Sequence, residues 1–468
     1  MKEKTFGEKL RGIFGLTYDA TENTNRRRFR DIKLRSEDKE LTDRDRKRLV
    51  SNTRDLQRNM SIAAWAVRKH LDYVSTFTFQ CRSGNPELDK RIESLVDWWS
   101  RPKNFDVAAR HSLRRYIRLL EERRTIDGDV FTMKLRDGRV QGIEGDRVRT
   151  PTHQDGKPLK LETKDVVHGV RLDVFGGARS YIVCDRGEYA NQFNFNREIP
   201  AQYVYQLGYF DRIDQVRGVS PMASALNTFS DVYESAEYAL AKAKVSQLFG
   251  LKFKRSGDDS LPVDTDSDGD TIEPYAFDFG KGPQLLDLDP GDDADFMESK
   301  TPSTEFADYC DRMIAAALKS LDIPYSFFDE SHTNYSGARQ ALLQYEQSAA
   351  NKRADLQQLL NQMTAWRLGL FVEDGILSLP RGMRLGDLKW EWIPTGLPWV
   401  DPLKESQADA MAVATGLSSR QRIAKSRGND WFTIADELEQ ENEILREKGI
   451  TVGGTVMTIN GANANDNN

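Results

Sequence analysis

Two short acidic motifs are the residues of this chain that could do metal chemistry. Glu144 and Asp146 are separated by a single glycine near the end of an expected strand. Two carboxylates placed in this way can hold the magnesium ion that assists phosphodiester hydrolysis in a nuclease. An isolated pair of carboxylates is also common in a solvated surface turn, which is the simpler interpretation. A metal-dependent nuclease therefore stays open as an alternative function.

The second acidic motif resembles half of a calcium-binding loop. Residues 264–270 read Asp-x-Asp-x-Asp-Gly-Asp, which is the first half of an EF-hand loop. The twelfth position of a working loop is a bidentate glutamate, and here it is Tyr275. Pro262 and Pro274 stand where the flanking helices should be. We expect a solvated acidic loop without EF-hand function, and weak cation binding stays open.

Motifs of the common catalytic classes do not occur in the sequence. It has no G-x-x-x-x-G-K-[ST] phosphate loop, no G-x-S-x-G elbow and no H-E-x-x-H zinc motif. The five histidines and the three cysteines, Cys81, Cys184 and Cys310, lack the spacing of a zinc site. Three distant cysteines indicate a reducing compartment without a disulfide framework. We expect a protein that is not an enzyme and that uses no metal or other cofactor.

Composition places the chain among large globular proteins. Its 468 residues suffice for two or three domains, and 30% of them are charged. No apolar run approaches the roughly 20 residues of a membrane span, and residues 1–10 have no apolar signal region. The net charge of -6 argues against wrapping nucleic acid over the whole surface. Residues 1–60 carry interleaved basic and acidic clusters, which suit either a nucleic-acid-binding arm or, more simply, a solvated arm or an amphipathic surface helix with internal ion pairs.

Local patterns predict the elements that would position these residues. Helical patterns cover residues 54–80 and 105–124. Between 129 and 209 the chain turns to short apolar runs punctuated by Gly, Asp and Asn, which is typical of an antiparallel β unit. The expected strands are residues 130–133, 166–170, 181–183 and 203–205.

Three helices are expected to begin at a capping residue followed by proline. Ser220-Pro221 is the first of these starts, and its helix extends to about residue 248 with many alanines that allow close packing. Thr301-Pro302 and Asp401-Pro402 are the other two. An acidic insert with glycine and proline, residues 250–300, separates the first two helices.

A loop and a long helix follow the second start. The loop contains Phe327, Phe328 and a polar tip at residues 331–335. Apolar residues then recur at spacings of three and four from Leu342 to Leu370, which predicts one helix of about 50 Å. The loop is either an ordinary interhelical turn or a part placed for contact.

The ordered set of motifs resembles one known family, the portal (head–tail connector) proteins of the lambda-type tailed bacteriophages. Gly337 stands where that family leads us to expect a second serine. The matching stretches run in family order from about residue 140 to 430, and they are Ile143-Glu144-Gly145-Asp146-Arg147, Arg217-Gly218-Val219-Ser220-Pro221, Ile323-Pro324 with Asn334-Tyr335-Ser336-Gly337-Ala338-Arg339, and Trp399-Val400-Asp401-Pro402-Leu403-Lys404-Glu405.

The resemblance implies an α+β, mostly helical portal fold with a β-rich wing region, two stem helices, a clip insert, a long wing helix and a helical crown. The implied division is a charged arm at 1–60, wing at 61–215, first stem helix at 216–249, clip at 250–300, second stem helix at 301–321, tunnel loop at 322–337, long wing helix with following strands at 338–399, crown at 400–450 and a disordered tail at 451–468.

The resemblance also implies a function. Such proteins form a ring, typically of twelve subunits, at one capsid vertex of the virion, after assembly in the host cytoplasm. Double-stranded DNA passes through the channel without sequence preference. The expected partners are the terminase large subunit, a head–tail adaptor and the major capsid or scaffold proteins, with no membrane contact. A different structural virion component, such as an adaptor, stays open as a further alternative.

Three groups of site residues follow from this plan. The tunnel loop at the channel would use Phe327, Phe328, His332, Thr333, Asn334 and Tyr335, with the two phenylalanines anchoring the loop on the wing. Lys242, Lys244, Lys252 and Lys254 are candidates for a band that faces DNA phosphates or pairs with acids of a neighbouring subunit. Asp292, Asp293 and Asp295 are candidates for docking a partner at the clip.

Overall fold

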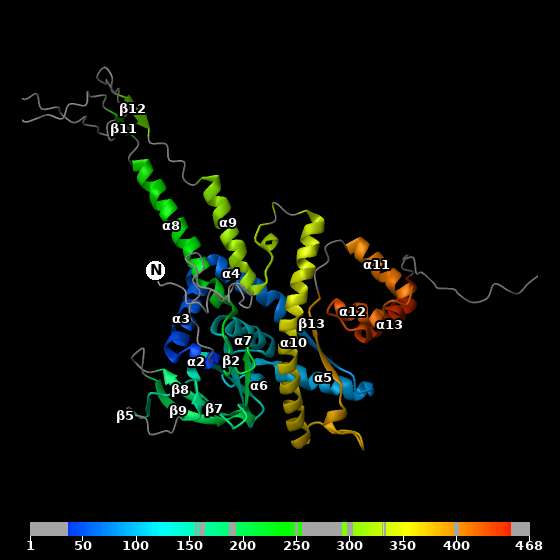
Figure 1. The fold of residues 1–468 in the computed structure, drawn as a ribbon. Helices are drawn as coiled ribbons and strands as arrows, with labels where there is room; N and C mark the ends of the chain where they lie inside the picture. The colour runs from blue at the N-terminus through cyan, green and yellow to red at the C-terminus, as the bar shows by residue number, and fades with distance from the viewer. Residues whose placement is uncertain are drawn as a thin grey trace, which may run out of the picture.

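The computed structural model describes residues 36–154, 157–158, 164–186, 193–248, 251–254, 293–296, 303–329, 331, 334–396 and 402–450. Helices predominate and several small, mainly antiparallel sheets accompany them (Figure 1), which confirms the expected α+β class at this level. Among the described residues, no helix is both long and apolar enough to cross a membrane. The EF-hand-like motif and residues 451–468 lie outside the described residues.

Two helices and a strand replace the single helix expected over residues 54–80. Helix α3 (Asp43–Asn59) follows the short α2 (Glu37–Glu40), and α4 (Ser61–Val74) begins after a break at the extended Met60. The prediction is wrong at its end, because Phe77–Cys81 forms strand β1 and pairs with β13 (Trp390–Pro394). A partner about 300 residues away decides that conformation, and local periodicity contains no sign of it.

Helix α3 packs against other helices of the main globular part of the molecule, the body, although it lies in the range expected as a charged arm. It contacts α4, α7 (Leu113–Asp127) and α8 (Leu226–Leu248). The sequence prediction missed α5 (Pro86–Ser100), which begins at an Asn85 cap and Pro86, and the short α6 (Pro102–Phe105). The helix expected over residues 105–124 corresponds to α7, which begins only at Leu113 after the Ser112 cap. The breaks between these helices therefore come from capping residues and proline rather than from a change in periodicity.

The β unit consists of two sheets. Strands β2 (Asp129–Lys134), β3 (Val140–Glu144) and β10 (Val204–Gly208) form a three-stranded sheet in the order β10-β2-β3. The six-stranded sheet has the order β5-β4-β9-β8-β7-β6, with bounds β4 His153–Gln154, β5 Lys157–Pro158, β6 Val166–Val167, β7 Val170–Leu172, β8 Ala178–Arg186 and β9 Phe193–Pro200.

The strand expected over residues 166–170 is instead a tight hairpin. His168 and Gly169 form the turn between β6 and β7, with φ of 48° and 85°. Glycine is required at the second position, because a Cβ there would come within 2.2 Å of the Arg149 backbone nitrogen.

Helices α8 and α9 (Thr304–Leu318) contact each other and project from the body (Figure 1). A 3₁₀ turn (Pro221–Ala225) precedes α8, and the Ser220 hydroxyl caps it as expected. The second expected start, Thr301-Pro302, lies outside the described residues, and α9 begins at Thr304 with the Ser303 side chain accepting a hydrogen bond from the Phe306 amide. Beyond the far ends lie the paired strands β11 (Leu251–Lys254) and β12 (Asp293–Phe296).

The long helix α10 (Tyr335–Glu373) crosses the whole body. Its 39 residues make it about 58 Å long, which confirms the long uninterrupted helix expected there. The expected apolar stripe faces the core, since Tyr345, Ala349, Leu356 and Met363 are almost fully buried. They belong to a large core that also contains residues of α4, α5, α7 and α9.

Three helices end the described chain, α11 (Pro402–Ala414), α12 (Arg420–Ser426) and α13 (Trp431–Lys448). They lie beside α10 and β13 in Figure 1. Ion pairs of Arg82 with Asp430 and of Lys425 with Glu391 tie them to the body. These helices keep Leu403, Met411 and Phe432 exposed, and Leu417 is exposed between α11 and α12.

Candidate functional site

The root of α8 is held by a buried ionic cluster centred on Arg217. Its guanidinium donates to both carboxylate oxygens of Asp129, at 2.6 and 2.9 Å. It also donates to the backbone carbonyls of Gly145, at 2.7 Å, and His168, at 2.6 Å. The side chains of Arg217 and Asp129 are almost wholly shielded from water. Their hydrogen-bonded arrangement therefore fixes the start of α8 on the two sheets.

Arg46 of α3 completes the cluster. It donates to Asp129 at 2.9 Å and to the backbone carbonyl of Gly218 at 2.8 Å, while the Gly218 amide donates to Asp129 at 3.0 Å. Burial opposes ionisation of Asp129, but Arg217 and Arg46 outweigh it and hold the pKa of this carboxyl below its usual value. One basic residue of the charged N-terminal range is therefore structural.

Glycine is required where the two chain segments cross. A Cβ on Gly218 would lie 2.2 Å from the carbonyl oxygen of Gly128, and a Cβ on Gly128 would lie 2.5 Å from that of Gly218. Ser220 then donates its hydroxyl to the Thr125 carbonyl at 2.6 Å. The Arg217-Gly218-Val219-Ser220-Pro221 motif is thus explained by close backbone approach, charge pairing and capping.

The helix pair beyond this root exposes large apolar side chains to solvent. In α8 Tyr238 is 72% and Leu240 is 56% exposed, and in α9 Tyr309 is 51% exposed. Val232 is the last buried hydrophobic residue of α8 within its described part. Because isolated pairs of helices bury little area, such a face is suited to contact with another protein surface.

The candidate charged residues lie toward the far end of this pair. Lys242 and Lys244 are exposed on the last turns of α8. Lys252 and Lys254 lie on β11 in register with Asp295 and Asp293 of β12, respectively. The structure therefore brings two of the basic candidates opposite two of the acidic ones on one ribbon, and Asp292 lies outside the described residues.

The two loop phenylalanines pack on the body. Phe327 stacks on Tyr73 of α4 with ring centroids 5.7 Å apart and meets Tyr345 of α10 at 5.4 Å. Phe328, which is 37% exposed, meets Trp65 edge-on at 5.8 Å. These contacts anchor the segment before the polar tip on α4 and α10, as the sequence led us to expect.

Polar contacts fix both ends of the loop. Asp322 accepts hydrogen bonds from Ser348 at 2.6 Å and Lys352 at 3.0 Å. Burial opposes its ionisation, but these two bonds outweigh it and hold the pKa of Asp322 below its usual value. At the other end, the Asn334 side chain accepts from the Gly337 amide at 2.7 Å and caps α10.

This cap shortens the expected loop. Tyr335 begins α10 and does not belong to the loop, because the capping side chain of Asn334 starts the helix earlier than the expected residue 338. The serine that the family leads us to expect at residue 337 would not improve the cap, because residue 337 contributes only its backbone amide to the hydrogen bond with Asn334. His332 and Thr333 lie outside the described residues.

The carboxylates considered for a nuclease site are occupied by arginines. Arg54 bonds Glu144 at 3.1 Å and Asp146 at 3.0 Å, and Arg186 bonds them at 2.6 and 2.8 Å. Burial opposes ionisation of Asp146, but Arg186 and Arg54 outweigh this effect and hold the pKa of Asp146 below its usual value. No group of three or more metal-ligating side chains occurs among the described residues. The ion-paired turn is therefore the interpretation that the geometry favours.

The chain is similar in sequence to a phage protein and in structure to chains of solved particles. A probable portal protein of Halomonas phage phiHAP-1 is 23% identical over 395 residues, which cover 78% of this chain and 72% of that protein. A chain in the neck of an empty GTA particle computed with C6 symmetry has a TM-score of 0.50 at 13% identity, covering 81% of this chain and 94% of its own. A chain in the neck of a native GTA particle computed with C12 symmetry reaches 0.47, also at 13% identity, with 81% and 93% covered.

The structural likeness concerns the fold alone. The match that assigns the family lies in the sequence, where residues 24–353 fit the family described as phage portal protein, lambda family. This range is well over half of the 468 residues and contains the Arg217 motif, the helix pair and the loop. The chain belongs to the lambda family of phage portal proteins.

Proposed function

We propose that this portal protein assembles into a closed ring at one capsid vertex, and that double-stranded DNA passes through the ring during packaging and ejection. The observation that carries the proposal is the projecting helix pair. Tyr238, Leu240 and Tyr309 remain exposed on it, and the Arg217 cluster holds its root rigidly on the body. Neighbouring copies in a ring would cover this face through heterologous contacts, which close when the rotation between subunits is constant.

In such a ring the loop after Phe328 faces the channel. The aromatic anchor on α4 and α10 supports a polar tip that can make weak, readily exchanged contacts with a sliding phosphate backbone. Lys242 and Lys244 supply a basic band near the far end of α8. A channel that DNA must slide through is expected to be largely acidic, with basic residues confined to such bands.

The ribbon of β11 and β12 and the acidic insert between them would dock the terminase large subunit during packaging and a head–tail adaptor afterwards. Charged residues dominate this end of the chain, including Asp293 and Asp295. A polar interface of this kind is expected to weaken with salt. Capsid or scaffold proteins would contact the body of the ring, and ATP hydrolysis would belong to the terminase.

Substitution of the exposed stem face tests the proposal. Mass photometry of the full chain should show rings, and Tyr238→Glu with Leu240→Glu should lower the ring population at least about tenfold. Ile376→Glu is a matched control, because Ile376 is a large exposed apolar residue beyond the end of α10. Rings at wild-type abundance in the stem variant would refute the assigned contact face, and an unmodified chain that never exceeds a dimer would refute the ring.

A further inference from the structure

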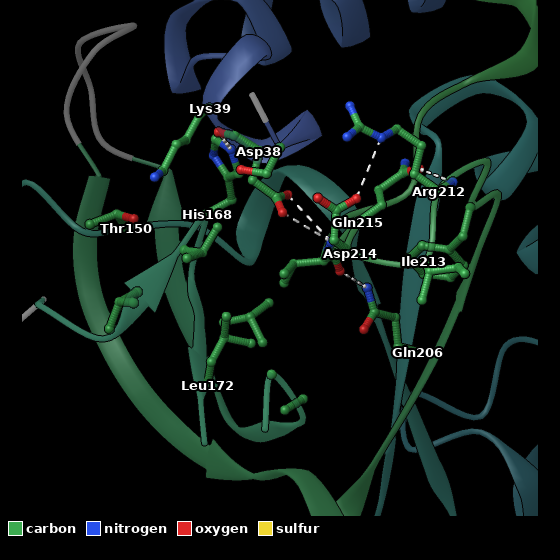
Figure 2. Close-up of a pocket in the computed structure, with 18 of the residues that line it drawn as sticks. Asp38, Lys39, Thr150, His168, Leu172, Gln206, Arg212, Ile213, Asp214 and Gln215 are labelled. Carbon is green, nitrogen blue, oxygen red and sulfur yellow. Dashed lines mark hydrogen bonds and ion pairs between the residues drawn. The ribbon is translucent and has the colours of Figure 1, made fainter. Parts of the chain in front are cut away.

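A large pocket of the body lies apart from the stem, the loop and the ribbon. It has a volume of about 1250 Å³ and opens between the β6–β7 hairpin and the segment of residues 206–216. Figure 2 shows His168 and Leu172 on one wall and Gln206, Arg212 and Ile213 on the facing wall. The volume exceeds that of most small-molecule pockets, which favours a segment of polypeptide as the occupant.

The pocket has apolar lips. Phe175, at the turn after β7, is 93% exposed, and Ile213 on the opposite wall is fully exposed. Phe210, which also lines the pocket, is 46% exposed, and Val174 beside Phe175 is 92% exposed. Large apolar side chains on both sides of one opening form the kind of patch that is covered by a binding partner.

The first described residues lie at the mouth of this pocket. Ser36 is one of the lining residues. Two residues later, the Asp38 side chain accepts from the Val216 amide at 3.3 Å, and the Asp38 backbone carbonyl contacts His168 Nε2 at 3.0 Å. His168 Nδ1 also meets Asp43 at 2.5 Å. Contacts with both walls therefore hold Asp38 at the mouth of the pocket, close to the point where residues 1–35 join the described chain.

The sequence of the first residues is complementary to the pocket. Phe6, Leu10, Ile13 and Phe14 have the spacing of one face of a helix. Residues 1–18 contain four basic and two acidic side chains, whereas the pocket is lined by four acidic and two basic ones. Charge and apolar pattern thus point to the same occupant.

We propose that residues 1–18 dock into this pocket of their own chain, with their apolar face against the lips formed by Phe175 and Ile213. Residues 19–35 connect the two, and 17 residues can span up to about 60 Å, so the docking is within reach. Attachment at the mouth gives the segment a high effective concentration, which favours its own chain over a neighbouring copy. The docking is independent of ring formation.

Disulfide trapping tests the docking in the full chain. Ile13→Cys is combined with Ile213→Cys in a Cys310→Ser background, in which Cys81 and Cys184 are buried. Oxidation should give a crosslink within one chain, seen as a monomer on a denaturing gel and located by mass spectrometry. The matched control pairs Ile13→Cys with Leu417→Cys, which is 80% exposed elsewhere, and should crosslink at least about tenfold less.

Two outcomes of this experiment overturn the proposal. Crosslinks formed only between chains would make the occupant a neighbouring copy. Equal crosslinking to residues 213 and 417 would mean that the segment has no preferred site.

A labelled peptide of residues 1–18 provides a second measurement. Fluorescence anisotropy should show the peptide binding to a chain that lacks residues 2–18, and at least about tenfold more weakly to the intact chain, whose pocket is filled. Phe175→Asp with Ile213→Asp in the shortened chain should also weaken binding at least about tenfold. Both residues are exposed, so these changes should not unfold the protein. Equal binding to all three proteins would refute the pocket as the site.

Discussion

Arg217 and Asp129 show how a short sequence motif can serve as a structural joint. The motif predicts a helix start, and the structure confirms that Ser220 caps it. The partner of Arg217 lies 88 residues earlier in the chain, and no local pattern indicates which acidic residue it is. Side-chain roles that depend on one chain segment crossing another could not be predicted, whereas capping roles, which are local, could.

Removal of Arg217 should be strongly destabilising. Arg217→Ala leaves the buried Asp129 with Arg46 as its remaining ionic partner, so the free energy of unfolding should fall by about 3–5 kcal/mol. Arg101→Ala serves as the control, because Arg101 pairs with Asp97 on the surface, and it should change stability by less than about 0.5 kcal/mol. Urea denaturation measures both, and equal effects would contradict a special role for the cluster.

His70 should make the body sensitive to acid. Burial lowers its pKa from the ordinary 6.5, although Glu121 at 2.8 Å opposes this shift. Below about pH 6.5 His70 takes up a proton in the unfolded chain, whereas in the folded chain it stays neutral down to its lower pKa. The contribution of His70 to the free energy of unfolding is therefore fully present above about pH 6.5 and is lost as the pH falls through the lower pKa of the folded chain. His70→Gln, which cannot titrate, should lose less stability between pH 7 and 5.5. Thermal unfolding across that window checks this, and parallel curves would contradict it.

At the scale of elements, long periodic helices and short apolar strands could be predicted, but their ends could not. The core-facing stripe of α10 was predicted from spacing alone. The strand Phe77–Cys81 was missed because its pairing with Trp390–Pro394 is long-range. The hairpin turn at His168 and Gly169 was missed because a histidine with positive φ is uncommon.

Changes in the aromatic anchor of the loop should lower stability, whereas changes in its polar tip should affect DNA retention. Phe327→Ala removes contacts with Tyr73 and Tyr345, and because Phe327 is only partly buried, the free energy of unfolding should fall by less than the about 3–5 kcal/mol typical of a fully buried phenylalanine. Deletion of residues 330–333 should leave stability and rings intact but reduce retention of packaged DNA. The deletion spares Asn334, because this residue caps α10.

Leu343→Ala is the control for the anchor, since Leu343 is an exposed residue of the same helix. DNA retention is measured by nuclease protection in assembled particles. If the deletion abolishes rings while Phe327→Ala affects only retained DNA, the roles of the two parts are reversed.

The ribbon of β11 and β12 allows a charge-swap test. Lys252→Glu with Lys254→Glu places like charges opposite Asp295 and Asp293, which should cost about 0.2–1 kcal/mol for each pair and accelerate amide exchange in β11. Adding Asp293→Lys and Asp295→Lys should restore protection. Restored protection without restored DNA retention would assign the lysines to phosphate contact, while recovery of both would assign them to cross-strand pairing.

At the scale of the whole molecule, the ordered motifs predicted the family, because each motif reflects a constraint of the fold. Gly218 marks a close crossing, Ser220 a cap and Asn334 the start of the long helix. Contacts between copies have no comparable signal in one chain. What indicates them is surface that the chain does not bury, such as Tyr238 and Leu240 on α8.

Electron microscopy of the purified full chain tests the central claim most directly. End-on averages should show closed rings of one subunit number with an axial channel, because the rigid stem root fixes the rotation between neighbouring copies. Side views should show the helix pairs gathered around the axis. Monomers, dimers or open filaments at micromolar concentration across a range of salt, with no closed ring, would contradict the account.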